Sequence, residues 1–193
     1  KVNVHRVPIG GAFGSSIQMN TPIAICVALA LKAQKPVKLV LSREEDMYDH
    51  CKYPTIIRLK YGVKRDGTLT AGELETIVDI GGHNIQAYPL LGCMASWFVS
   101  LYRMPHMKFK GTAVYTNKAP ACAMQGYGNP QVSFAVESQM DIIAEELGID
   151  SIDLRLKNYV GLGKTFWGQG PTVRSVIRSC GVEEMLVKGK DII

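Results

Sequence analysis

The sequence lacks several features that would place it in a common class. It has no run of eighteen apolar residues and no basic stretch leading into an apolar one, so we expect neither a membrane span nor a secretory signal. Its cysteines are five in number, widely spaced and without a Cys-x-x-Cys pair, which favours a reducing, cytoplasmic location. The chain starts at Lys1 without a methionine, and we expect it to be an internal fragment of a longer protein.

Signatures of metal and nucleic-acid binding are also missing. The histidines share no ligand spacing, so we expect no metal site built from side chains. The net charge is +5 and the pI near 8.9, but lysine and arginine are scattered without interleaved aromatic residues, which argues against nucleic-acid binding. A dispersed positive surface suits an anionic cofactor or an acidic partner subunit, or is simply solvated.

What is present predicts an α+β fold. With 193 residues, 47% of them hydrophobic, the chain can form one core or two small lobes, which we place at residues 1–54 and 55–193. In the first lobe, a short strand at residues 2–7 leads into a glycine-rich turn. A helix from Thr21 to Lys35 and a buried apolar strand at residues 37–41 then complete a β-turn-helix-β unit.

The second lobe shows alternating strand and helix patterns. Residues 55–63 and 68–81 read as a hairpin, because the Asp66-Gly67 pair between them is a strong turn signal. We expect further strand, helix and loop segments, with a mixed or antiparallel sheet and helices packed on it. They are a helix at 88–102, a strand at 108–115, a helix capped by Asn129 and ended by Gly148, a helix capped by Ser151 and reaching Asn158, a loop at 161–170 and a terminal helix at 173–187.

Two glycine-rich turns are the most informative feature. Gly10-Gly11-Ala12-Phe13-Gly14 and the stretch at residues 121–131, Ala-Cys-Ala-Met-Gln-Gly-Tyr-Gly-Asn-Pro-Gln, each precede a predicted helix. Glycines allow positive φ and close backbone approach, and helix starts offer unpaired N–H groups to anionic oxygens. One such turn is usually an ordinary link from strand to helix. Two in matched contexts predict a cradle whose halves approach one another in space.

The pair resembles the molybdenum-binding subunit of the xanthine dehydrogenase and aldehyde oxidase family. In that family a Gly-Gly-Gly-Phe-Gly-Gly-Lys turn and an Ala-Phe-Arg-Gly-Phe-Gly-x-Pro-Gln turn hold the cofactor. The resemblance continues through residues 42–47, 141–148, 153–155 and 179–181 with Glu184, and so covers nearly the whole chain. It implies a molybdopterin, in the cytosine dinucleotide form, with molybdenum, and 2Fe-2S and FAD groups on partner domains or subunits.

Site residues follow from the same resemblance. It implies cofactor contacts from Gly10, Gly11, Ala12, Phe13, Gly14, Cys122, Gln125, Gly126, Tyr127 and Gly128. It implies no metal ligand and no catalytic residue in this chain, because the family's catalytic Glu lies in a later segment. Partners would be the remainder of the molybdenum subunit, the iron–sulfur and FAD subunits and a small-molecule substrate, with a homo-oligomer as a further option. Cys122 can equally be read as a small buried hydrophobe.

Three departures from the family pattern concern the substrate. Gln125 replaces a common Arg and carries no permanent charge. Ser16 and Ile17 stand where purine-hydroxylating relatives have Lys and Glu. Cys93 falls near the position where those relatives carry a substrate-orienting Arg. The implied pocket of Ile17, Cys93 and Tyr127 therefore fits an aldehyde-like or less polar substrate better than xanthine.

Two main functions remain open at this point. The first is part of the catalytic subunit of a molybdenum hydroxylase that oxidises an N-heterocycle or aldehyde, with the isolated fragment inactive. The second is a noncatalytic truncated paralogue, or an interaction or maturation fragment of the same fold. Binding of a nicotinamide dinucleotide is disfavoured, because residues 10–14 lack the Gly-x-Gly-x-x-Gly spacing and no acidic residue ends the stretch at 37–41.

Overall fold

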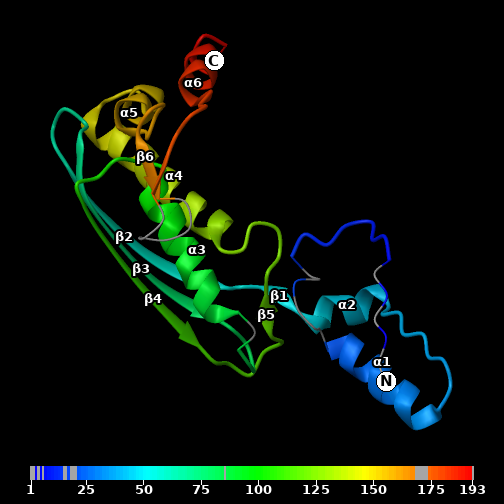
Figure 1. The fold of residues 1–193 in the computed structure, drawn as a ribbon. Helices are drawn as coiled ribbons and strands as arrows, with labels where there is room; N and C mark the ends of the chain where they lie inside the picture. The colour runs from blue at the N-terminus through cyan, green and yellow to red at the C-terminus, as the bar shows by residue number, and fades with distance from the viewer. Residues whose placement is uncertain are drawn as a thin grey trace.

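A three-stranded mixed sheet is the largest sheet among the described residues and lies along one side of the molecule (Figure 1). The computed structural model describes residues 3, 5, 7–14, 17, 21–84, 86–167 and 174–192. Strands β2 (Thr55–Val63) and β3 (Leu69–Asp79) pair antiparallel, as the predicted hairpin requires, and β4 (His106–Val114) pairs with β3 in parallel. The long crossover between these parallel strands contains helix α3 (Ala87–Ser100). The predicted mixed sheet and α+β class are confirmed.

Two helices cover one face of this sheet and form the core with it. They are α3 and α4 (Asn129–Leu147), which lie on the same side of the strands in Figure 1. The helices predicted at 88–102 and from Asn129 to Gly148 are confirmed, and apolar residues at helical spacing along them are buried. The fully buried apolar side chains include Leu74 and Val78 from β3, Leu90, Met94 and Phe98 from α3, and Val132 and Met140 from α4.

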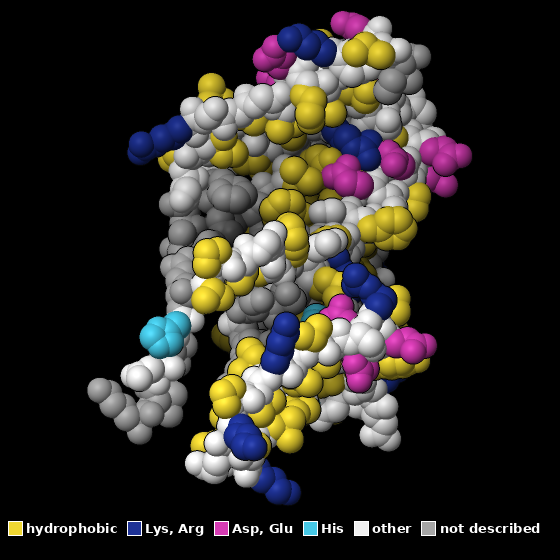
Figure 2. Space-filling view, turned by 90° about the vertical axis from the view of Figure 1, so that its right-hand side faces the viewer, with side chains coloured by type: hydrophobic (Ala, Val, Ile, Leu, Met, Phe, Trp, Pro, Cys, Tyr) yellow, Lys and Arg dark blue, Asp and Glu magenta, His cyan; other side chains and the backbone are white. Residues whose placement is uncertain are grey.

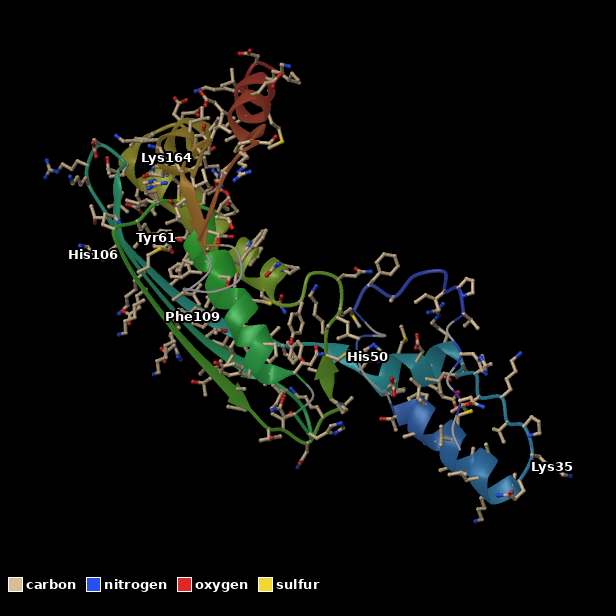
Figure 3. The ribbon with its side chains drawn as sticks, viewed as in Figure 1. Lys35, His50, Tyr61, His106, Phe109 and Lys164 are labelled. Carbon is tan, nitrogen blue, oxygen red and sulfur yellow. The ribbon has the colours of Figure 1, made fainter. Side chains whose placement is uncertain are left out.

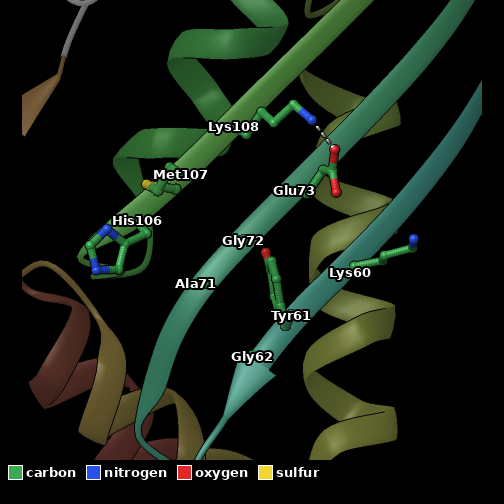
Figure 4. Close-up of a pocket in the computed structure, with 9 residues that line it drawn as sticks. All are labelled: Lys60, Tyr61, Gly62, Ala71, Gly72, Glu73, His106, Met107 and Lys108. Carbon is green, nitrogen blue, oxygen red and sulfur yellow. Dashed lines mark hydrogen bonds and ion pairs between the residues drawn. The ribbon is translucent and has the colours of Figure 1, made fainter.

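The opposite face of the sheet carries charge. Glu73 on β3 pairs with Lys108 on β4 at 2.7 Å, and Glu75 pairs with Lys110 at 2.8 Å. Figure 4 shows the first of these pairs beside the strand ends. Successive residues along each strand thus point alternately to an apolar inner face and a charged outer face, because the side chains of a strand repeat every two residues.

Two predicted helix caps are shifted by one residue. Gly128, not Asn129, is the N-cap of α4, and it has a left-handed backbone with φ of 87°. Asp150, not Ser151, caps α5 (Ser151–Asn158), because its carboxylate accepts hydrogen bonds from the N–H groups of Ile152 and Asp153, each at 3.0 Å. The predicted end of α4 at Gly148 is confirmed by its left-handed C-cap.

The first lobe differs from the prediction. Helix α1 (Thr21–Ala33) is present, and α2 (Arg43–Asp49) begins with a capping box between Ser42 and Glu45. The buried strand predicted at residues 37–41 is wrong: these residues belong to no strand, and Val40 is 72% exposed. Part of the strand predicted at 2–7 lies outside the described residues, and positions 3, 5 and 7 are not in a strand.

A short parallel pair joins the N-terminal region to the second glycine-rich stretch. Strand β1 (Cys51–Lys52) pairs with β5 (Ala121–Cys122), with Lys52 opposite Cys122. In Figure 1 this pair lies between α1 and α2 at one end and the large sheet at the other. Residues 1–54 therefore do not form the predicted β-turn-helix-β unit, and β1 pairs them with residues 121–122.

The C-terminal region is also different. The helix predicted at residues 173–187 is wrong, because strands β6 (Thr165–Trp167) and β7 (Arg174–Val176) form an antiparallel pair and α6 (Val182–Lys190) begins only after Gly181. Residues 168–173 lie outside the described part of the chain. No helix among the described residues is both long and apolar enough to cross a membrane.

Candidate functional site

The two glycine-rich turns lie against each other. The backbone N–H of Gln125 in the second turn donates a hydrogen bond of 2.8 Å to the carbonyl oxygen of Phe13 in the first. At Gly14, a Cβ atom would lie 2.6 Å from the carbonyl oxygen of Ala123, so only glycine allows this approach. The predicted meeting of the two turns is confirmed.

Both turns contain the same unusual backbone conformation. Phe13 and Gly14 have φ values of 48° and 108°, and Gln125 and Gly126 have 43° and 107°. Tyr127 then repeats the positive φ at 44°. Bulky residues rarely adopt this region, and such strain persists where the surrounding structure enforces it, often at ligand sites. The shared conformation supports a common task for the two turns.

The second turn presents unused backbone donors. In the described part of the chain, the N–H groups of Gly126, Tyr127 and Gly128 donate no hydrogen bond, while the next N–H, from Asn129, bonds the carbonyl of Gly126 at 3.0 Å. Successive N–H groups in such turns form concave anion sites, and the start of α4 adds the positive end of a helix dipole. The geometry is therefore suited to an anionic ligand.

Lys52 contacts the second turn from β1. Its Nζ donates a hydrogen bond of 2.9 Å to the carbonyl oxygen of Gln125. Gln125 is thus bonded on both sides, through its N–H to the first turn and through its carbonyl to β1. Lys52 could not be identified from the sequence, because the two-residue strand that carries it has no detectable periodicity.

Tyr53 lies beneath the second turn and was also missed. It is 3% exposed, and its ring meets that of Tyr127 edge-on, with centroids 6.3 Å apart. Tyr127 donates its hydroxyl to the carbonyl of Gln86 at 2.7 Å, and burial raises the pKa of Tyr127 to about 12. The Tyr53 hydroxyl has no hydrogen-bond partner among the described residues. A buried donor without a partner is costly, so this hydroxyl marks a position where a polar group is expected.

The other predicted site residues, Cys122, Cys93 and Ile17, differ in burial and in the element that carries them. Cys122 is 3% exposed, and burial together with the charge of Asp49 raises the pKa of its thiol to about 11. Cys93 lies on α3, close enough to Tyr127 for its charge to raise the pKa of that tyrosine. Ile17 is 62% exposed and joined to the first turn by its N–H, which donates to Gly14 at 3.3 Å. Ser16 lies outside the described residues.

These positions bear on the predicted pocket. Cys122 lies in β5 at the start of the second glycine-rich stretch, and its thiol is buried. Cys93 and Tyr127 lie near one another, whereas Ile17 is joined to the first turn. In the first turn, Phe13 is 74% exposed. Its ring lies over Gly11, where an added Cβ atom would be 2.6 Å from the Phe13 Cε2.

Two surface hollows among the described residues lie along the large sheet. One of about 380 Å³ is lined by strand ends of the sheet, including Tyr61 and His106 (Figure 4). Another of about 430 Å³ lies between β2 and α4, beside Phe134. Among the described residues no group of three or more His, Cys, Asp or Glu side chains could hold a metal ion. His50, labelled in Figure 3 just after α2, pairs with Asp49 at 2.9 Å.

A family model agrees with the two-turn geometry. Residues 1–159 match the molybdopterin cofactor-binding domain. The chain belongs to this family. Its relatives are molybdenum oxidoreductases of the xanthine dehydrogenase and aldehyde oxidoreductase type, as the resemblance implied.

Individual relatives support this family assignment. The chain is 34% identical over 193 residues to the putative xanthine dehydrogenase molybdenum-binding subunit of Escherichia coli (strain K12), covering 99% of this chain and 25% of that protein. It is 35% identical over 172 residues to the aldehyde oxidoreductase of Megalodesulfovibrio gigas, covering 88% of this chain and 19% of that one. The solved aldehyde oxidoreductase of Desulfovibrio gigas superposes with a TM-score of 0.81 at 31% identity, covering 95% of this chain and 20% of that one. The chain thus spans about a fifth to a quarter of these relatives.

Proposed function

We propose that this chain is the part of a molybdenum hydroxylase's catalytic subunit that grips a molybdopterin cofactor between two backbone turns. The hydrogen bond from Gln125 to Phe13 is the observation that carries the proposal, because it joins the two turns into one site. The full enzyme would oxidise an N-heterocycle or an aldehyde and pass electrons to iron–sulfur and FAD partners. Its cytoplasmic location, also proposed, is supported by cysteines that are odd in number and widely spaced.

The residues at the two turns fit such a cofactor. Neither turn contains an acidic residue, and the unused N–H groups of Gly126, Tyr127 and Gly128 can receive anionic oxygens. Tyr53 supports the second turn through the contact of its ring with that of Tyr127. When bound, the molybdenum group supplies the oxidation chemistry, and these residues hold and orient it. We propose the cytosine dinucleotide form.

Helix α1 supports the proposed docking of the remainder of the subunit. None of its residues is buried, although apolar side chains occur all around it, and a helix of this kind is normally enclosed. Figure 2 shows hydrophobic side chains crowding the part of the surface where this helix lies. The exposed members are Ile23, Ile25, Val27, Leu29 and Leu31. We propose that the rest of the molybdenum subunit covers them, and that residues 1–54 and 55–193 act as two lobes around the turns.

The proposed substrate is small and weakly polar. Ile17, Cys93 and Tyr127 offer no permanent charge, and Gln125 offers an amide with two donors and one acceptor. A pocket built from such groups favours an aldehyde or a less polar heterocycle over a purine that must be held by charged side chains.

The alternative is a noncatalytic paralogue or maturation fragment of the same fold. It is favoured by the neutral side chains at positions 17 and 125, which stand where hydroxylating relatives carry charge. Both functions predict the same fold, but only the first predicts bound cofactor and turnover.

The full molybdenum subunit, purified with its native partners, separates them. We expect one molybdenum and one pterin dinucleotide per subunit, and reduction of a dye by aldehydes faster than by xanthine. A fully folded complex with neither metal nor pterin would support the noncatalytic alternative. This chain alone is expected to hold no stoichiometric molybdenum and to turn over no substrate, since the proposed cofactor would also need contacts from the rest of the subunit.

A further inference from the structure

We propose that Lys52 provides the positive charge of the cofactor site, holding an anionic oxygen of the cofactor at the second turn. This inference rests on the proposed function and adds a binding residue to it. It starts from the hydrogen bond of 2.9 Å between the Lys52 Nζ and the Gln125 carbonyl.

The position of Lys52 is fixed by its backbone. It lies in β1 directly opposite Cys122 of β5, and β5 is the strand that leads into the second turn. Its ammonium reaches Gln125, whose N–H is already bonded to Phe13 of the first turn. The ammonium is therefore attached to the segment where both turns meet. A flexible lysine on a loop would lose more side-chain entropy when it binds a ligand.

The charge of Lys52 is not neutralised by the protein. Among the described residues it forms no ion pair, whereas Lys118, also on the segment before the turn, pairs with Asp79 at 2.9 Å. Asp49, which lies close enough to affect Cys122, is paired with His50 instead. Neither of the two turns contains a lysine or an arginine. Among the described residues, Lys52 is thus a cation that remains without an ion pair at this site.

The chemistry of an ammonium fits this task. It has three N–H donors, and the Gln125 carbonyl accepts one of them, which leaves two for a ligand oxygen. Among the described residues, the N–H groups of Gly126, Tyr127 and Gly128, which follow Gln125 along the chain, are unused. A point charge next to several backbone donors is a usual arrangement for phosphate and other oxyanions. Gln125 lacks the charge to do this, so β1 supplies it from outside the turn.

The test compares single variants of the full molybdenum subunit in its native complex. Lys52→Met removes the charge and Lys52→Arg keeps it. Lys60→Met is the matched control, because it removes one exposed lysine from the outer face of the sheet. The measurement is the rate at which pterin and molybdenum are lost during dialysis at low and at high salt, together with the melting temperature of each complex.

We expect Lys52→Met to lose cofactor about tenfold faster than the wild type at low salt, and Lys52→Arg and Lys60→Met to match the wild type. High salt should speed the loss from the wild type more than from Lys52→Met, because salt screens the attraction that the variant lacks. Equal rates for Lys52→Met and Lys60→Met would overturn the inference. So would a loss in both Lys52 variants with lowered melting temperatures, since this would indicate a purely structural role.

The proposed function has its own outcome in the same experiment. A Gly126→Val complex that keeps its cofactor would contradict the cradle itself. A Gly126→Val complex without cofactor, beside a Lys52→Met complex that retains it, would leave the cradle standing and remove only the role of Lys52.

Discussion

At the scale of single residues, buried polar side chains hold distant parts of the backbone together. Asn158, at the end of α5, is 4% exposed. Its Oδ1 accepts from the N–H of Leu69 at 3.0 Å, and its Nδ2 donates to the carbonyls of Gly67 and Leu154, each at 2.9 Å. The hairpin between β2 and β3 is thereby fixed to a helix that lies far along the chain.

We expect Asn158→Ala to lower the free energy of unfolding by about 2–4 kcal/mol, because it leaves the Leu69 N–H and the Gly67 carbonyl without these partners in the interior. Urea denaturation of the chain, followed by circular dichroism, measures the change. Asn117→Ala is the matched control, since Asn117 is exposed and should change stability by less than about 0.5 kcal/mol. Similar small effects for both variants would mean that Asn158 is not a structural tie.

At the scale of elements, the segments with long periodic patterns could be predicted and the short ones could not. The hairpin and the helices around Met94 and Met140 follow from spacing alone, because their buried faces repeat over several turns. The stretch at 37–41 is apolar but has no strand partner among the described residues, so its composition alone led to a wrong prediction of a strand. Strands β1 and β5 are two residues long, and only tertiary pairing defines them.

The same limit applies to the candidate site. The two glycine turns could be predicted, because positive φ restricts residue choice and leaves a mark in the sequence. Lys52 and Tyr53 could not, because their contacts with the second turn depend on how β1 pairs with β5. Their residue types carry no motif, so only the structure brings them to the site.

The end of β3 predicts a pH effect. Hydrogen bonds from the Thr116 hydroxyl, the Gly81 N–H and Lys118 lower the pKa of Asp79 to about 2. The unfolded value is about 4, so this carboxylate stabilises the fold fully above about pH 4, and the contribution disappears as the pH falls through about 2. These bonds hold residues 116–118, which lead into β5 and the second turn.

We therefore expect the wild-type chain to lose stability between pH 4 and 2 more steeply than Asp79→Asn, which cannot titrate there. Urea unfolding at several pH values across this range measures the difference. Asp46→Asn, on exposed α2, makes the same change of charge and should retain the steep wild-type profile. Parallel profiles for the wild type and Asp79→Asn would show that Asp79 is not the group responsible.

At the scale of the whole molecule, helix α1 determines how the chain behaves alone. Its exposed apolar side chains leave a surface that other copies of the chain can cover. We expect sedimentation velocity at tens of micromolar to show species larger than the 21.2 kDa monomer. Replacing Val27 and Leu31 with Lys should restore the monomer, whereas Ile192→Lys, at a single exposed position near the end of the chain, should not. A wild-type chain that stays monomeric would contradict this role of α1.

The central claim is that the two turns together hold a molybdopterin cofactor, and cofactor content tests it most directly. Gly126 has φ of 107°, and a Cβ there would lie 2.7 Å from the ring of Pro130, so Gly126→Val must distort the second turn. Gly163→Ala is the matched control, because Gly163 also has positive φ but lies in a distant loop with open space around it.

Molybdenum and pterin are measured per subunit in the full native complexes of both variants and the wild type. We predict close to one of each in the wild type and in Gly163→Ala, and less than about a tenth in Gly126→Val, because the proposed anion-binding N–H groups would be displaced. A Gly126→Val complex that retains one molybdenum and one pterin per subunit would contradict the account.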